Sequence, residues 1–145
     1  MSRKISLVFG ALIFIGAQFS FGSAMPPDMR DYLCTIQRVA SALYAAGDLH
    51  ELDKKVYVGK KFTISRLTGS MSGALRSPLV VAPIVVDYGS SENSFKVVTA
   101  MNQQQSIGPG TLLETLTVSE YIESAQKPFV VASGESVYFG ICEHF

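Results

Sequence analysis

The feature that most constrains this chain is the position of its only two cysteines, Cys34 and Cys142, near the two ends of residues 25–145. A disulfide between them would enclose the 107 residues from 35 to 141. In the chain-entropy account of crosslinks, closing a loop of that length stabilises a fold by about 4 to 5 kcal/mol. Because bonded cysteines have Cα atoms only about 5 to 6 Å apart, the first and last structural elements would then be neighbours.

A catalytic thiol is the alternative interpretation of Cys142, because His144 follows two residues later. A cysteine nucleophile needs a free thiolate and a base aimed at it, and a disulfide removes the thiolate. The choice between the two depends on the compartment in which the protein folds, since disulfides persist in oxidising compartments.

Residues 1–24 have the three zones of a secretory signal peptide. Arg3 and Lys4 give a basic start, residues 5–17 form an apolar run of 13 residues, and Gly22-Ser23-Ala24 supplies small residues for cleavage. A membrane-spanning helix needs about 20 apolar residues, so a permanent anchor is not expected. We expect cleavage after Ala24 and a periplasmic or secreted protein, in which the two cysteines pair.

The remaining residues, 25–145, suffice for a single domain and are too few for two. The whole chain is 48% apolar and 17% charged, which predicts a packed core rather than disorder. Its 12 basic and 12 acidic residues cancel, and without Arg3 and Lys4 the balance is 10 against 12, a formal charge of −2. No strong positive field is present, so we expect no nucleic-acid partner. Stable membrane insertion after signal cleavage is not expected either.

From Val56 onward, short segments rich in Val, Ile, Thr, Phe and Tyr alternate with clusters of Gly, Pro, Ser and Asn, as in strands joined by turns. Pro83 cannot donate to a ladder, so it belongs at a sheet edge or a bulge. Within one expected strand, Glu114 alternates onto the same face as Leu116 and Val118. The expected strands cover residues 61–65, 79–88, 94–100, 112–118, 128–132 and 137–142, with hairpin connections at 89–93 and 133–135.

Residues 32–39 fit two structures. Tyr32, Ile36 and Val39 recur at helical spacing, and this periodicity alone slightly favours a helix. The same segment, YLCTIQRV, also suits a strand because it is rich in β-branched and aromatic residues.

Five phrases stand out along residues 34–145: Cys34-Thr35-Ile36, the run 57–64 (YVGKKFTI), the run 87–96 (DYGSSENSFK), Lys127-Pro128-Phe129 and the ending 137–145 (VYFGICEHF). In this order they resemble a group of small exported bacterial proteins that are β-rich and carry a cysteine near each end of the mature chain. The resemblance implies a strand at residues 32–39. Ser65 departs from it, since an acidic residue is expected before Arg66, and so does Ser70, where a basic residue is usual. No activity accompanies that group, so the resemblance assigns no functional residue.

These observations predict an all-β fold. We expect a single antiparallel barrel or sandwich of about seven or eight short strands, closed by a Cys34–Cys142 disulfide between the first and last strands.

The motifs of common enzymes are incomplete in this sequence. The segment 69–73 (GSMSG) has Met71 where a hydrolase nucleophile elbow needs serine, so a turn after a strand is expected. His50 begins a zinc-protease pattern in which Lys54 replaces the second histidine. We therefore assign no catalytic, cofactor-binding or metal-ligating residue and no cofactor, and the disulfide cysteines are the only site residues predicted.

Two features leave other functions open. Acidic pairs, such as Asp48 with Glu51 or Glu114 with Glu120, could serve carboxylate catalysis if the fold brought them together. Four lysines within residues 54–61 form a basic patch, which suits either a solvated strand end or contact with an anionic surface such as phospholipid.

The leading interpretation is an exported, non-enzymatic envelope protein. It would either carry a small or apolar ligand inside the barrel or dock to another envelope protein through its loops. The alternatives are a periplasmic hydrolase or lyase with carboxylate catalysis, and an enzyme inhibitor that presents one loop from a rigid scaffold. An interior filled by side chains would favour docking, whereas clustered acids in a cleft would favour an enzyme.

Overall fold

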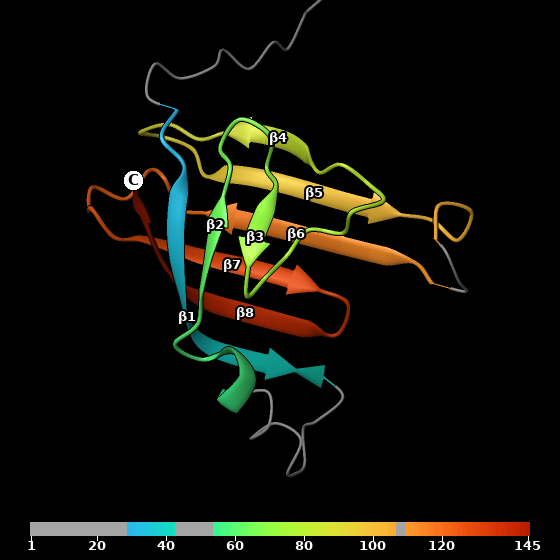
Figure 1. Cartoon of the computed structure of the whole chain (residues 1–145). Coiled ribbons are helices and arrows are strands. Elements are labelled where there is room, and N and C mark those ends of the chain that lie inside the picture. The colour runs from blue at the N-terminus through green and yellow to red at the C-terminus, as the bar shows by residue number, and fades with distance from the viewer. Residues whose placement is uncertain (1–28, 43–53, 107–109) are drawn as a thin grey trace, which may run out of the picture.

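The computed structural model describes residues 29–42, 54–106 and 110–145. The predicted signal peptide, residues 1–24, lies outside this part of the chain. Neighbouring strands are all antiparallel, and the sheet order is β3-β2-β1-β8-β7-β6-β5-β4 (Figure 1). The prediction of an all-β fold of about eight strands is confirmed. The strands are β1 (Tyr32–Ser41), β2 (Lys61–Ile64), β3 (Met71–Gly73), β4 (Ile84–Tyr88), β5 (Phe95–Met101), β6 (Leu112–Val118), β7 (Lys127–Ser133) and β8 (Ser136–His144).

A bend in β1 turns this sheet into a curled half-barrel. The first residues of β1, Tyr32 to Thr35, pair with both β2 and β8. After a bulge between Ile36 and Arg38, the only described strand that pairs with β1 is β8. The β2–β3 hairpin is thereby carried across the face of β5–β8 (Figure 1).

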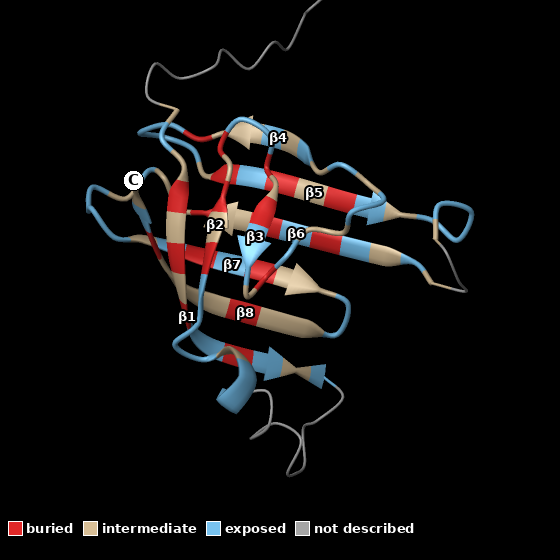
Figure 2. Ribbon diagram, viewed as in Figure 1, coloured by how far each residue is buried: buried red, intermediate tan, exposed pale blue. Residues whose placement is uncertain are grey.

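The core fills the space between the hairpin and the sheet. Buried residues alternate with more exposed ones along much of β1, β5 and β6, as the period of a strand requires (Figure 2). Phe62 of β2 meets Phe129 of β7 edge-on, with ring centroids 5.2 Å apart. The largest fully buried side chains are Tyr32, Phe62, Phe95, Phe129, Ile36, Ile64, Leu116, Val118 and Val131.

Gly140 of β8 allows close packing by the two strands that flank it, β1 and β7. A Cβ atom at this position would collide with the Thr35 carbonyl oxygen and would lie 2.8 Å from the Phe129 ring. The absence of a side chain therefore lets β1 and the Phe129 ring pack directly on β8.

Two local predictions can be compared with the structure. Residues 32–39 form a strand, as the resemblance implied. Helical periodicity was the misleading signal, because this segment pairs with β8 and its first residues also pair with β2. The expected strand at 79–88 begins only at Ile84, directly after Pro83, so its first half was wrongly predicted. No helix in the described part of the chain is long and apolar enough to cross a membrane.

Candidate functional site

The predicted disulfide is present and joins β1 to β8. Cys34 and Cys142 are direct cross-strand partners with a Cα–Cα distance of 3.9 Å, and both are fully buried. The distance is shorter than the roughly 5 to 6 Å expected of a disulfide and also shorter than about 4.5 Å, the separation in a non-hydrogen-bonded antiparallel pair. The first and last strands are thus neighbours, and Cys142 carries no free thiol.

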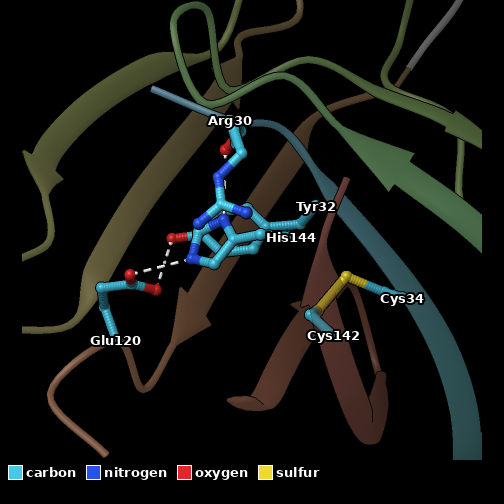
Figure 3. The surroundings of a disulfide bond; sticks show 6 residues. All are labelled: Arg30, Tyr32, Cys34, Glu120, Cys142 and His144. Atoms are coloured by element: carbon cyan, nitrogen blue, oxygen red, sulfur yellow. Dashed lines mark hydrogen bonds and ion pairs between the residues drawn. A yellow bond between two sulfur atoms is a disulfide. The ribbon is translucent and has the colours of Figure 1, made fainter. Parts of the chain in front are cut away.

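A polar cluster lies beside the disulfide, at the end of the half-barrel where β1 begins (Figure 3). The Tyr32 hydroxyl donates to Glu120 Oε2 at 2.9 Å, and His144 Nε2 lies 2.9 Å from Glu120 Oε1. The Arg66 guanidinium reaches the same Oε1 at 3.8 Å. These four side chains, Tyr32, Arg66, Glu120 and His144, are called the polar cluster below.

The polar cluster connects the two ends of the sheet. Arg66 is only 3% exposed and follows β2, yet its Nε and Nη2 atoms donate to the Tyr88 carbonyl oxygen at the end of β4, at 3.1 and 2.9 Å. Its own main-chain N–H donates to Asp31 Oδ1 at 2.8 Å. Arg66 therefore bridges the β2 side and the β4 side of the sheet, where no strand ladder joins them among the described residues.

The bonding of His144 sets what this cluster can do chemically. Its Nδ1 atom lies 3.3 Å from the Arg30 carbonyl oxygen and its Nε2 atom faces Glu120, so both ring nitrogens face acceptors. A singly protonated ring can donate to one of them, whereas the imidazolium donates to both. Neither nitrogen is directed at a serine or cysteine nucleophile in these contacts. The geometry therefore suits a structural crosslink better than a general base.

A pocket of about 470 Å³ lies over the polar cluster. Lys127 lines it, but its Nζ atom donates to the carbonyl oxygens of Glu120 and Ile122. Ser90 also lines it, and its hydroxyl accepts from the Glu92 and Asn93 N–H groups and shapes the turn before β5. The Lys127 ammonium and the Ser90 hydroxyl thus form hydrogen bonds within the fold.

A second polar set occupies the opposite end of the concave face. Five residues on adjacent strands face one another in register there: Thr99, Glu114, Ser133, Ser136 and Ser41. Glu114 is 8% exposed, and its Oε1 atom has no hydrogen-bond partner among the described residues. Burial raises the pKa of its carboxyl above the usual value, and a hydrogen bond from Ser133 opposes this in part.

The exposed edge of the sheet is a third candidate. β4 is the outermost strand at one end of the sheet, and β3, at the other end, has only three residues. Ile84 of β4 is 65% exposed, and Leu79, in the segment leading into it, is 84% exposed. Val80 and Val86 also expose more than half of their surface. Four exposed apolar side chains thus lie in residues 79–86, two of them in the free edge strand itself and two in the segment that leads into it. This stretch is called the β4 edge below.

The acidic pairs suggested by the sequence do not form a site in the described structure. Glu114 is buried within β6, whereas Glu120 follows the end of β6 and contacts Tyr32 and His144 beside the disulfide, so the two carboxyl groups belong to different polar sets. Asp48, Glu51 and His50 lie outside the described residues. No group of three or more His, Cys, Asp or Glu side chains that could hold a metal ion occurs in the described ranges.

The sequence also suggested a turn at 69–73 and a basic patch at 54–61. The turn lies at 66–68, with the Gly69 N–H donating to the Ser65 carbonyl oxygen, whereas Met71–Gly73 form β3 with Met71 buried, so the turn was wrongly predicted for these last three residues. The four lysines of residues 54–61 are all exposed, three of them in the turns before β2 and Lys61 as its first residue.

Sequence reasoning missed the polar cluster and its function in closing the half-barrel. Tyr32 and Glu120 are 88 residues apart, and Arg66 and Tyr88 are 22 apart, so no local spacing indicates either contact. The one available signal was Arg66, which lies between an expected strand at 61–65 and the turn residues Thr68-Gly69. If such an arginine is buried, its charge needs partners, and these must come from elsewhere in the chain.

No family model, curated protein or solved structure matches this chain. The candidate sites therefore rest on the residues and their geometry alone.

Proposed function

We propose that this chain is an exported, non-enzymatic docking protein that binds an extended segment of a partner protein as an added strand beside β4. The observation that carries the proposal is the β4 edge. Leu79, Val80, Ile84 and Val86 are each more than half exposed within eight consecutive residues. An apolar patch of this kind on a sheet edge is characteristic of an interaction site.

The chemistry of the edge specifies the occupant. An outermost strand presents main-chain N–H and C=O groups that an incoming strand can pair with. Charged side chains usually protect such edges, but the only charged residue within β4 is Asp87, whose Oδ1 atom accepts from the Gly89 N–H. A partner strand with alternating apolar residues would bury Ile84 and Val86 while its main chain extends the sheet.

Two rival functions have less support from the geometry. Transport inside the barrel needs an internal cavity, whereas large side chains such as Phe62, Phe95 and Phe129 fill the space between the hairpin and the sheet. Carboxylate catalysis needs convergent acids, and Glu114 lies at the far end of the fold from Glu120. Both arguments favour a binding surface over an internal or catalytic site.

The location forms part of the same proposal. A buried disulfide fits a protein outside the cytoplasm, because reducing systems keep cytoplasmic thiols free. Removal of residues 1–24, release to the periplasm or the medium, and membership of the group of small exported proteins remain predictions from the sequence.

Site-specific photocrosslinking in the cells that export the protein tests this function. A photoreactive amino acid in place of Ile84 is expected to give a discrete crosslinked product with one partner. Amide hydrogen exchange on the purified complex should then show slower exchange in residues 84–88, because an added strand protects edge amides.

Leu113 supplies a matched control for this experiment. Its side chain is 64% exposed, nearly the same as Ile84, but it lies on β6, which has a paired strand on both sides. The same label at Leu113 should give no product. Identical products from both positions, or a complex that leaves the β4 amides unprotected, would contradict strand addition.

A further inference from the structure

The groove beside the second half of β1 is a separate feature that the β4 edge does not involve. The last links between β1 and the β2 side are the Ile36 N–H donating to the Lys60 carbonyl oxygen and the Gly59 N–H donating to the Ile36 carbonyl oxygen, at 3.0 and 2.8 Å. Beyond this point β1 diverges from the helical turn at residues 54–57. The divergence leaves a groove of about 640 Å³ lined by Gln37, Arg38, Val39, Ala40, Lys54, Lys55 and Val58.

The charged residues in the described lining of this groove are all basic. Arg38, Lys54 and Lys55 supply three cationic groups, and none of the described residues that line the groove is acidic. The Arg38 guanidinium lies 5.7 Å from the centroid of the Phe139 ring, its cross-strand neighbour on β8. This cation–π contact holds the guanidinium near the groove without using its hydrogen-bond donors.

The remaining lining of the groove is largely apolar. Val39 and Ala40 of β1 and Val58 after the helical turn contribute to it, and Val58 is 40% exposed although it is a β-branched apolar residue. Small-molecule sites are usually concave and mostly apolar, hold a few polar groups and have volumes of about 300 to 1,000 Å³. The groove has these properties, with cations as its polar groups.

We propose that this groove binds a single-chain lipid with an anionic phosphate or carboxylate headgroup. The Arg38 guanidinium and the Lys55 ammonium bind the headgroup, since guanidinium and ammonium groups form charge-assisted hydrogen bonds with oxyanions. The acyl chain lies mainly against Ala40 and Val58, which are exposed, and removes their apolar surface from water, while the buried Val39 adds little surface. The headgroup and the chain therefore use different parts of the same groove.

Titration calorimetry of the disulfide-bonded chain with dodecyl phosphate, below its critical micelle concentration, tests this site. One saturable site per chain is expected. Arg38→Gln and Lys55→Gln should each weaken binding by about tenfold or more, since each removes a charge-assisted hydrogen bond. Val58→Asn should weaken binding of dodecyl phosphate without changing the response to inorganic phosphate.

Arg76→Gln is the matched control, because it removes one exposed positive charge that does not line the groove. Its affinity should equal that of the unmodified chain. If Arg76→Gln lost as much affinity for dodecyl phosphate as Arg38→Gln, the losses would reflect general charge attraction, and the proposed site would be wrong. Inorganic phosphate binding as tightly as dodecyl phosphate would also overturn it, because the apolar lining would then contribute nothing.

Vesicles distinguish a single lipid from a membrane surface. If the chain binds phosphatidylglycerol vesicles but not monomeric dodecyl phosphate, the groove is part of a membrane-docking face and the single-lipid site is wrong. If neither probe binds, the proposal fails, while strand addition at β4 is unaffected.

Discussion

The two ends of the concave face differ in how well their buried carboxyl groups are hydrogen-bonded. At the end where β1 begins, Glu120 contacts Tyr32, Arg66 and His144, and Arg66 also bonds the carbonyl end of β4. At the other end, Glu114 leaves one carboxyl oxygen without a described partner.

This difference shows how burial of a carboxyl group can either stabilise or weaken the same fold. Where donors converge on it, the carboxylate links distant strands. Where a single hydroxyl of Ser133 faces it, burial raises its pKa and favours the neutral form. The end of the half-barrel beside the disulfide should therefore be the more resistant to opening.

The largest loss of stability is expected from removing the disulfide, which lies beside the polar cluster. Cys34→Ala together with Cys142→Ala should lower the free energy of unfolding by about 4 kcal/mol, because the unfolded chain regains the entropy of a long loop. Urea denaturation at neutral pH measures this. A loss below about 1 kcal/mol would mean that the polar cluster and the β1–β8 ladder already hold the chain ends together.

Arg66→Met should cost about 3 kcal/mol, because it leaves the Tyr88 carbonyl and Glu120 without their buried cation. Thermal and urea denaturation give the loss in stability. Arg66→Lys is the informative control, because it keeps the charge but loses the paired donors to the Tyr88 carbonyl. Its free energy of unfolding should lie between those of the unmodified chain and Arg66→Met. Full recovery in Arg66→Lys would show that charge alone closes the half-barrel.

Removing one hydroxyl at each end compares the two regions directly. Tyr32→Phe should lower the free energy of unfolding by about 1.5 to 3 kcal/mol, because its hydroxyl donates to a carboxylate. Ser41→Ala should change it by about 0.5 kcal/mol or less, because the Ser41 hydroxyl has no described partner to lose. Equal losses in the two variants, measured by urea denaturation, would contradict the contrast between the ends.

An effect of about 1 kcal/mol, smaller than that of Tyr32→Phe, is expected from Glu114→Gln, and it should depend on pH. The pKa of Glu114 is raised in the folded state, so its contribution is fully present below the pKa of the unfolded chain and is lost as pH rises through the folded-state pKa. The unmodified chain should therefore lose stability relative to Glu114→Gln between pH 4 and pH 8. Thermal unfolding of both proteins over this range checks the sign, and a constant difference would show that Glu114 has a partner in solution.

Much of the fold was predictable because strands have a short, local signature. The alternation of Glu114, Leu116 and Val118 correctly predicted that these side chains share one face of their strand, and the structure buries that face. The two cysteines correctly placed the first strand beside the last. At Ile84 the prediction failed by several residues, because an apolar composition does not distinguish a strand from an exposed segment that leads into it.

The candidate sites were far less predictable. Glu120 and His144 were recognised as ionisable residues, but their contact depends on where the ends of β6 and β8 meet. The sequence pattern likewise left open whether β4 has one neighbour or two, and its exposure follows from that.

The amino-acid sequence by itself determined the strand positions, the facing of their side chains and the crosslink between the chain ends, because each depends on residue type and on a period of two. Only the tertiary structure decided which strand became the free edge, where Arg66 closes the curled sheet and why a groove opens beside Arg38. These features depend on the bend of β1 after Ile36 and on contacts between residues far apart in the chain, and no local pattern encodes either.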